Sequence, residues 1–112
     1  MIELTLPWPP TVNTYYRSTG GTVLISEKGR LYRKAVADQV LIQRGAKLFS
    51  GRLDVVIHAF PPDKRKRDLD NILKALFDSL TKAGVWLDDS QIDRFSVQRC
   101  AIGGMVKVAI HE

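Results

Sequence analysis

The chain has 112 residues, 45% of them hydrophobic, so it fits one small domain and is too apolar to be a disordered basic tail. Its 17 Lys and Arg against 12 Asp and Glu give a formal net charge of +5, which favours nucleic acid or another polyanion over acidic protein partners. The single cysteine, Cys100, excludes an intrachain disulfide, and without a signal-peptide pattern or a membrane-length apolar run we expect a cytoplasmic protein with no membrane partner.

The first half of the chain predicts a strand, a proline-set loop, a second short strand and a helix. Residues 2–6 alternate apolar and polar side chains before a Pro-rich stop, and residues 22–25 form a short strand after a Gly-Gly turn. Ser26 has the chemistry of an N-cap, so a helix is expected over residues 27–44. Its expected core face consists of Leu31, Ala35, Val36, Val40 and Leu41. Its expected basic side consists of Arg30, Arg33, Lys34 and Arg44.

The second half predicts three strands and a helix. Residues 53–60 read as a strand with Val55, Ile57 and Ala59 on one face. A helix over residues 69–83 has its expected core face at Ile72, Leu73, Leu76, Phe77 and Leu80. Residues 92–102 and 105–111 are expected to form a hairpin around Gly103-Gly104. We expect Cys100 to be a buried thiol, and Trp8 and Trp86 to anchor a core or an interface.

These elements predict one α+β domain over residues 1–112, with a mixed β-sheet of four to five strands packed against two main helices. Dimerisation would bury more surface than a chain of this length buries alone. The pattern does not give the order of the strands in the sheet.

Carboxylates gather at the start of the second helix, directly after a run of four cations. Asp68 and Asp70 lie where side chains are not yet committed to helical spacing, so they can share a cation. Mg²⁺ prefers carboxylate and water oxygens and is commonly completed by substrate phosphate, so two or three aspartates suffice. The third would come from Asp88 or Asp89, in the loop after the helix.

Lys74 lies four residues after Asp70, which puts an ammonium beside the expected metal, where it can position a scissile phosphate or stabilise its charge. The basic run supplies phosphate contacts through Lys64, Arg65, Lys66 and Arg67. Together these groups predict metal-assisted hydrolysis of a phosphodiester.

Each piece also has a structural interpretation. The two aspartates at the helix start fit capping, Lys74 fits an exposed pair with Asp70 or Asp78, and residues 88–89 fit a polar turn or the N-cap of a short helical turn. The basic run alone is typical of a solvated loop. The conjunction favours catalysis, because crowding carboxylates beside four cations has no evident structural benefit.

Three blocks of the sequence carry a resemblance to a known family. They are Leu6-Pro7-Trp8-Pro9-Pro10 with Asn13, Tyr15, Tyr16 and Arg17; Arg67-Asp68-Leu69-Asp70-Asn71 with Lys74; and Ala83-Gly84-Val85-Trp86-Leu87-Asp88-Asp89-Ser90-Gln91. In this order, and over nearly the whole chain, they resemble the RusA family of Holliday junction resolvases, small magnesium-dependent endodeoxyribonucleases of bacteria and their phages. The second block followed by the third is much more specific than a lone D-x-D.

The resemblance implies a RusA-like homodimer that binds a four-way DNA junction and resolves it by paired symmetric nicks in recombination and repair. It implies Mg²⁺, with Mn²⁺ as a substitute, held by Asp68, Asp70 and Asp89, and it makes Lys74 the catalytic lysine. Asp88 is expected to support its neighbour. The expected DNA contacts are the basic run with Asn13, Tyr16 and Arg17. Tyr15 and Tyr16 can stack on unpaired bases, with core packing as the alternative.

Two other functions compete with a junction endonuclease. A non-catalytic DNA-binding protein with a structural acidic cluster would keep its fold and its DNA binding under chelation. It would show no cleavage with any metal. An enzyme on free nucleotides is the weaker alternative, because the chain has no Walker-type phosphate loop.

Overall fold

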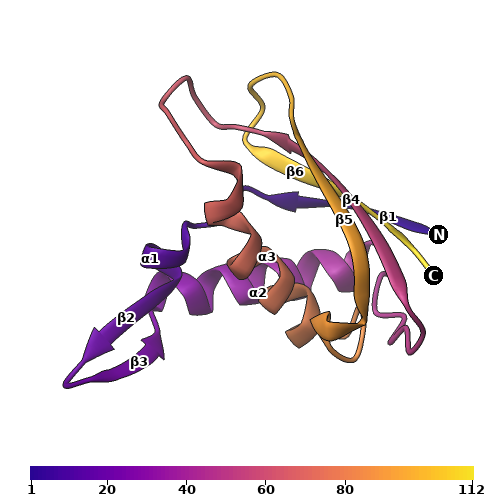
Figure 1. Cartoon of the computed structure of the whole chain (residues 1–112), viewed down its shortest axis with the longest axis horizontal. Helices are drawn as coiled ribbons and strands as arrows, with labels where there is room; N and C mark the ends of the chain where they lie inside the picture. The colour runs from indigo at the N-terminus through magenta and orange to yellow at the C-terminus, as the bar shows by residue number, and fades with distance from the viewer.

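A four-stranded mixed sheet forms the centre of the computed structural model, which describes residues 1–112 (Figure 1). The strands lie in the order β1-β6-β4-β5, with β1 and β4 both antiparallel to β6, and with β4 parallel to β5. Their bounds are Ile2–Pro7 for β1, Leu53–Phe60 for β4, Ile92–Arg99 for β5 and Met105–His111 for β6. This confirms the expected α+β class and mixed sheet.

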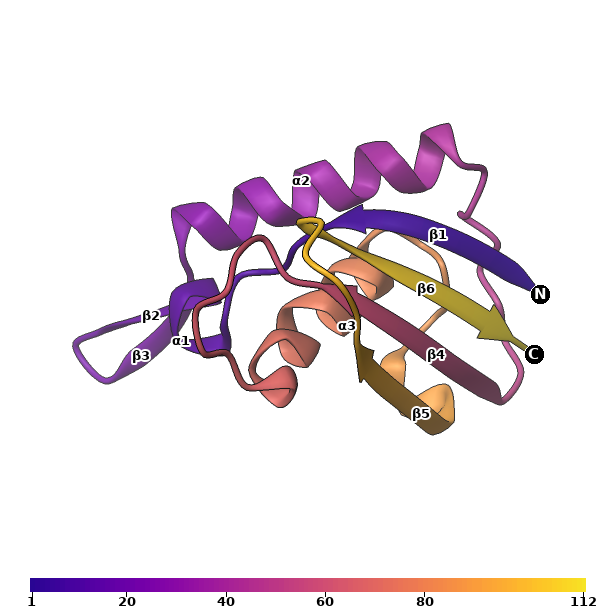
Figure 2. The ribbon, with the colours of Figure 1, turned by 90° about the horizontal axis from the view of Figure 1, so that it is seen from above.

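Two long helices cover one face of this sheet, as seen from above in Figure 2. Strand β4 follows the predicted alternation, because Val55, Ile57 and Ala59 are fully buried toward the helices while Val56 and His58 remain half-exposed on the other face. No helix of the chain is both long enough and apolar enough to cross a bilayer.

The predicted hairpin between the last two strands is wrong, because β4 lies between β5 and β6. Strand β5 instead runs parallel to β4, and parallel neighbours need a long crossover, which here is the segment containing α3. The glycine pair folds the β5–β6 loop against the loop after β4: the Gly103 N–H donates to the Pro61 carbonyl at 2.8 Å, and Gly104 adopts φ +87°.

Helix α2 spans Glu27–Ile42 and begins at the predicted cap, where the Ser26 side chain accepts the Gly29 N–H. Its buried face is Gly29, Tyr32, Val36 and Val40. The expected core positions Leu31 and Leu41 are 60% and 70% exposed, so that part of the prediction is wrong. The buried residues recur at spacings of three and four, and Leu31 and Leu41 each lie one residue from that stripe.

The predicted second helix is confirmed with a tighter first turn: a 3-10 segment η1 (Leu69–Ile72) leads into α3 (Leu73–Lys82). The expected core residues Ile72, Leu76, Phe77 and Leu80 are buried, and Gly84 ends the helix at φ +82°. Trp86 is fully buried beyond it and donates its indole N–H to the Thr81 hydroxyl at 2.6 Å. It is therefore the core anchor expected from the sequence.

A small β-ribbon projects from the body beside the start of α2 (Figure 1). It consists of β2 (Tyr16–Thr19) and β3 (Thr22–Ile25), which pair only with each other and follow the short helix α1 (Val12–Tyr15). Strand β3 was predicted and β2 was not. A final 3-10 turn, η2 (Asp89–Gln91), precedes β5.

Candidate active site

Two of the expected metal ligands lie where the chain enters α3. Asp68 is the residue before η1, with φ −88° and ψ 129°, and Asp70 lies in the first turn of η1. Both are exposed. Although Asp68 occupies the capping position, its side chain caps no backbone N–H. Helix capping therefore does not account for Asp68.

The loop after α3 gives its two aspartates different environments. Asp88 caps η2: its carboxylate accepts the Ser90 N–H at 3.2 Å, and its own N–H donates to the Gln91 side chain at 2.8 Å. Bonds from the Ser90 hydroxyl and N–H, with a smaller contribution from the charge of Lys74, lower the pKa of the Asp88 carboxyl. Asp88 therefore shapes the turn, and the half-exposed Asp89 carboxylate beside it makes no hydrogen bond or ion pair.

Every other aspartate in the chain has a partner, which sets Asp68, Asp70 and Asp89 apart. Lys or Arg side chains form ion pairs with Asp38, Asp54, Asp63, Asp78 and Asp93. The three carboxylates without protein partners are exposed or half-exposed, so they are the aspartates of this chain that are available to an external cation.

Within one chain, these three carboxylates do not lie close enough together to bind a single metal ion. No group of three His, Cys, Asp or Glu side chains lies close enough to hold an ion, so the expected convergence of Asp89 on Asp68 and Asp70 is not formed by the single chain as it stands. The donors fit Mg²⁺ all the same, because this ion is commonly held by one or two carboxylates, with water and substrate phosphate completing the octahedron. Asp68 and Asp70 supply such a pair.

Lys74 presents a free ammonium one helical turn after Asp70. It is exposed on α3 and forms no ion pair with Asp70 or Asp78, so the surface-pair interpretation does not hold. Its charge is among the smaller influences that lower the pKa of the Asp88 carboxyl. Lys74 is thus within electrostatic range of the loop that carries Asp89.

The basic run is only partly free. Lys64, Arg65 and Lys66 are exposed, whereas the Arg67 side chain is 19% exposed and lies 2.6 Å from the Asp63 carboxylate. The Arg67 bond, aided by the Arg65 N–H, lowers the pKa of Asp63 to about 2, so the pair is charged at any neutral pH. Arg67 is therefore oriented by the fold, and the neighbouring cations are the ones exposed to a polyanion.

Two residues of the site region were not predicted. Arg99 lies at the end of β5, donates to the Arg67 carbonyl at 2.7 Å and lines one recess with the basic run and Asp68. The half-buried Trp8 lines a second recess beside Asp68, with Thr11, Asn71 and the floor residue Ile72. Arg99 lies opposite Ala59 in the pairing of β5 with β4, and this pairing brings it close to the basic run. The predicted hairpin paired β5 with β6 instead, so it did not place Arg99 at the site.

The expected contacts from the N-terminal loop lie elsewhere on the surface. Asn13, Tyr16 and Arg17 line a separate hollow at the base of the β-ribbon. Tyr15 is fully buried, so for it the core-packing interpretation is correct. The Cys100 thiol is half-exposed rather than buried, since it lies just beyond the last residue of β5.

A surface with partnerless carboxylates, a free lysine and a cationic recess fits one class of protein, a small α+β nuclease. A family model described as endodeoxyribonuclease RusA matches residues 7–111. The chain belongs to this family.

Similar proteins come from phages and enterobacteria. The chain is 44% identical over 98% of its length, and 93% of the relative, to "Crossover junction endodeoxyribonuclease rusA" of Enterobacteria phage 82. It is 43% identical, with the same coverage, to the protein of that name from Escherichia coli strain K12. It is 47% identical to the one from Enterobacteria phage HK97, over 87% of this chain and 81% of the relative. The chain is an endodeoxyribonuclease.

Proposed function

We propose that the protein resolves four-way DNA junctions by Mg²⁺-dependent paired nicks, in recombination and repair. The observation that carries this proposal is the set of free carboxylates, Asp68, Asp70 and Asp89, in a family whose relatives are named for crossover junctions. Asp68 and Asp70 hold the ion, which supplies a Lewis acid and an acidified water when bound.

The chain's own side chains supply the positioning. Backbone phosphates beside the scissile bond are bound by the cations that are exposed in the recess with Asp68, which are Lys64, Arg65, Lys66 and Arg99. Lys74 places a second positive charge beside the scissile phosphate, where negative charge builds in the transition state. Asn13, Tyr16 and Arg17, in their separate hollow, contact a more distant part of the junction.

The proposed assembly is a homodimer. A four-way junction is nearly twofold symmetric, and paired nicks require two identical sites, which one chain of this size does not offer. Because no three-carboxylate cluster forms within one chain, Asp89 joins Asp68 and Asp70 either by movement of the 88–89 turn or from the second copy.

The direct test is nicking of a synthetic four-way junction by the wild type and by Asp70→Asn. We expect nicking with Mg²⁺ or Mn²⁺, none with EDTA, and none with Asp70→Asn, whose junction affinity is equal to or higher than that of the wild type because a repulsive charge is gone. Asp38→Asn is the matched control, since Asp38 is an exposed aspartate already paired with Lys34. Nicking by Asp70→Asn at the wild-type rate would remove Asp70 from the metal site.

The competing non-catalytic DNA-binding function gives a different result in the same assay. It predicts that the wild type binds the junction with and without EDTA and never nicks it with any metal. Its acidic cluster would have to be structural, so Asp70→Asn would lower the free energy of unfolding, whereas we expect little change because Asp70 has no partner to lose.

Mixed dimers distinguish the two origins of Asp89. When Asp70→Asn and Asp89→Asn subunits are combined, a site built within one chain is defective in both halves and no nick appears. If the second copy supplies Asp89, the mixed dimer keeps one intact site and makes single nicks. Each single-variant homodimer is the control and is expected to be inactive.

A further inference from the structure

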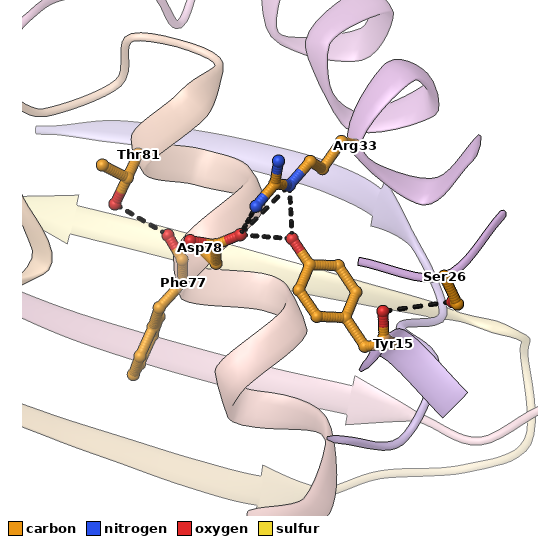
Figure 3. Close-up of polar contacts among 6 residues, drawn as sticks. All are labelled: Tyr15, Ser26, Arg33, Phe77, Asp78 and Thr81. Atoms are coloured by element: carbon orange, nitrogen blue, oxygen red, sulfur yellow. Dashed lines mark hydrogen bonds and ion pairs between the residues drawn. The ribbon is translucent and has the colours of Figure 1, made fainter. Parts of the chain in front are cut away.

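Three side chains from the helices α1, α2 and α3 meet in a polar network one turn after Lys74 (Figure 3). The Tyr15 hydroxyl of α1 donates to the Asp78 carboxylate of α3. Arg33 of α2 donates from Nη2 to the same Asp78 oxygen at 2.5 Å and from Nε to the Tyr15 oxygen at 2.6 Å. Arg33, which the sequence places on the basic side of its helix, is therefore paired with a carboxylate of α3 and is not free to contact a polyanion.

The network holds Asp78 as a shielded carboxylate. Its side chain is 21% exposed and that of Arg33 is 27% exposed. Burial by itself raises the pKa of Asp78, but the bonds from Tyr15 and Arg33, with a smaller contribution from Lys74, bring it below its ordinary value. Asp78 is therefore ionised at neutral pH, and both of its strong donors come from outside α3.

Lys74 lies between two carboxylates on the same helix. Asp70 is four residues before it and Asp78 is four residues after it, and both spacings put an ammonium within reach of a carboxylate. Lys74 nevertheless pairs with neither of them. Tyr15 and Arg33 both donate to the same Asp78 oxygen, Oδ2, and so fix the orientation of this carboxylate.

We propose that Arg33 and Tyr15 are positioning residues that hold Asp78 away from Lys74, and so keep the Lys74 ammonium available for the scissile phosphate. This inference rests on the proposed role of Lys74. Without Arg33, the Asp78 carboxylate is free to pair with Lys74, one turn earlier on α3, whose charge already contributes to lowering the pKa of Asp78. The network therefore determines whether the Lys74 ammonium stays free for the scissile phosphate or pairs with Asp78 on its own helix.

The test compares single-turnover nicking of a saturated junction by Arg33→Met, Asp78→Asn and the double variant. All three break the same ion pair, but only Arg33→Met leaves a carboxylate free to capture Lys74. We expect Arg33→Met to lose about tenfold in rate, or about 1.4 kcal/mol, at unchanged junction affinity. Asp78→Asn and the double variant should nick within about threefold of the wild type, which is under 1 kcal/mol.

To prevent differences in stability from affecting the rates, the unfolding curve of each variant is measured first, and each variant is assayed at a temperature at which it is fully folded. If Arg33→Met does not fold, Arg33→Lys replaces it, because a lysine keeps the charge but makes fewer bonds to Asp78; a smaller loss that Asp78→Asn reverses is then expected. A network that only joins the helices would leave the double variant at least as slow as Arg33→Met, and that result would overturn the inference.

Lys74→Ala separates this inference from the function on which it rests. If Lys74→Ala nicks at the wild-type rate, the proposed role of Lys74 fails and the inference fails with it. If Lys74→Ala is inactive while Arg33→Met and Asp78→Asn lose rate equally, the junction nuclease stands and only the positioning role is refuted.

Discussion

Gly29 offers the sharpest test of how α2 packs against α1. An alanine at this position should destabilise the protein, although alanine favours helices. In the first turn of α2, a Cβ at position 29 would lie 2.5 Å from the Tyr15 carbonyl oxygen and 2.9 Å from Ile25 Cγ2. The closer contact is with backbone, so no change of rotamer relieves it. We therefore expect Gly29→Ala to push α1 away from α2.

The magnitude follows from two opposing contributions. Overpacking of a tight core contact costs roughly 1–3 kcal/mol, and contact with a carbonyl oxygen places this site at the upper end. Replacing glycine by alanine in a helix returns up to about 1 kcal/mol. The net expectation is a loss of about 2 kcal/mol in the free energy of unfolding, which lowers Tm by about 8 °C for a chain of this size.

Urea unfolding followed by circular dichroism measures this loss through the midpoint, with an unchanged slope. Lys28→Ala is the matched control, since Lys28 is the exposed neighbour of Gly29 in the same turn, and we expect it to change stability by less than about 0.5 kcal/mol. A Gly29→Ala protein as stable as the wild type, or more stable, would refute the close packing of α1 on α2.

The further predictions concern charge and core at three positions, Asp63, Arg99 and Trp86. Asp63→Asn should raise junction affinity by releasing Arg67, seen by fluorescence anisotropy as a salt dependence steeper by about one unit. Because the folded pKa of Asp63 is depressed to about 2, the Arg67 pair stabilises the fold above the ordinary carboxyl pKa, and the wild type and Asp63→Asn should converge in unfolding free energy as pH falls through about 2. Arg99→Ala should weaken binding and reduce the salt slope by about one unit, with the nicking rate of the bound junction unchanged. Trp86→Ala should cost about 3–5 kcal/mol in urea unfolding, because the indole is fully buried, and a loss below 1 kcal/mol would contradict its place in the core.

Local patterns in the sequence predict the elements of this fold well, because short-range periodicity determines them. The alternation of β4, the Ser26 cap and the apolar stripe of α3 all lie where the pattern puts them. The sequence predictions are wrong where the pairing of strands depends on segments that are far apart in the sequence. A glycine pair between two strands favours a hairpin, but β4 lies between these strands and pairs with both. No local pattern in the sequence contains that information.

The same limit applies to the site. Asp68, Asp70 and Asp89 could be selected from the sequence through the RusA resemblance, but the absence of partners for these carboxylates could not, because it depends on which cations the fold has assigned elsewhere. Arg99 and the partner of Arg33 were missed for the same reason, since each arginine is brought to its partner by the packing of separate elements.

The free charges of the site are not explained by a shortage of opposite charge. The Arg99 guanidinium reaches the carbonyl of Arg67, one residue from Asp68, yet Asp68 makes no ion pair with it. Lys74 has a carboxylate four residues away on either side and pairs with neither. One possible partner in each place is already paired inside the fold, Arg67 with Asp63 and Asp78 with Arg33. Asp70 has no such partner and lies free beside Lys74, as Asp68 does near Arg99. The fold therefore pairs the charges around the site with one another and leaves those of Asp68, Asp70 and Lys74 available at the surface to a metal and a phosphate.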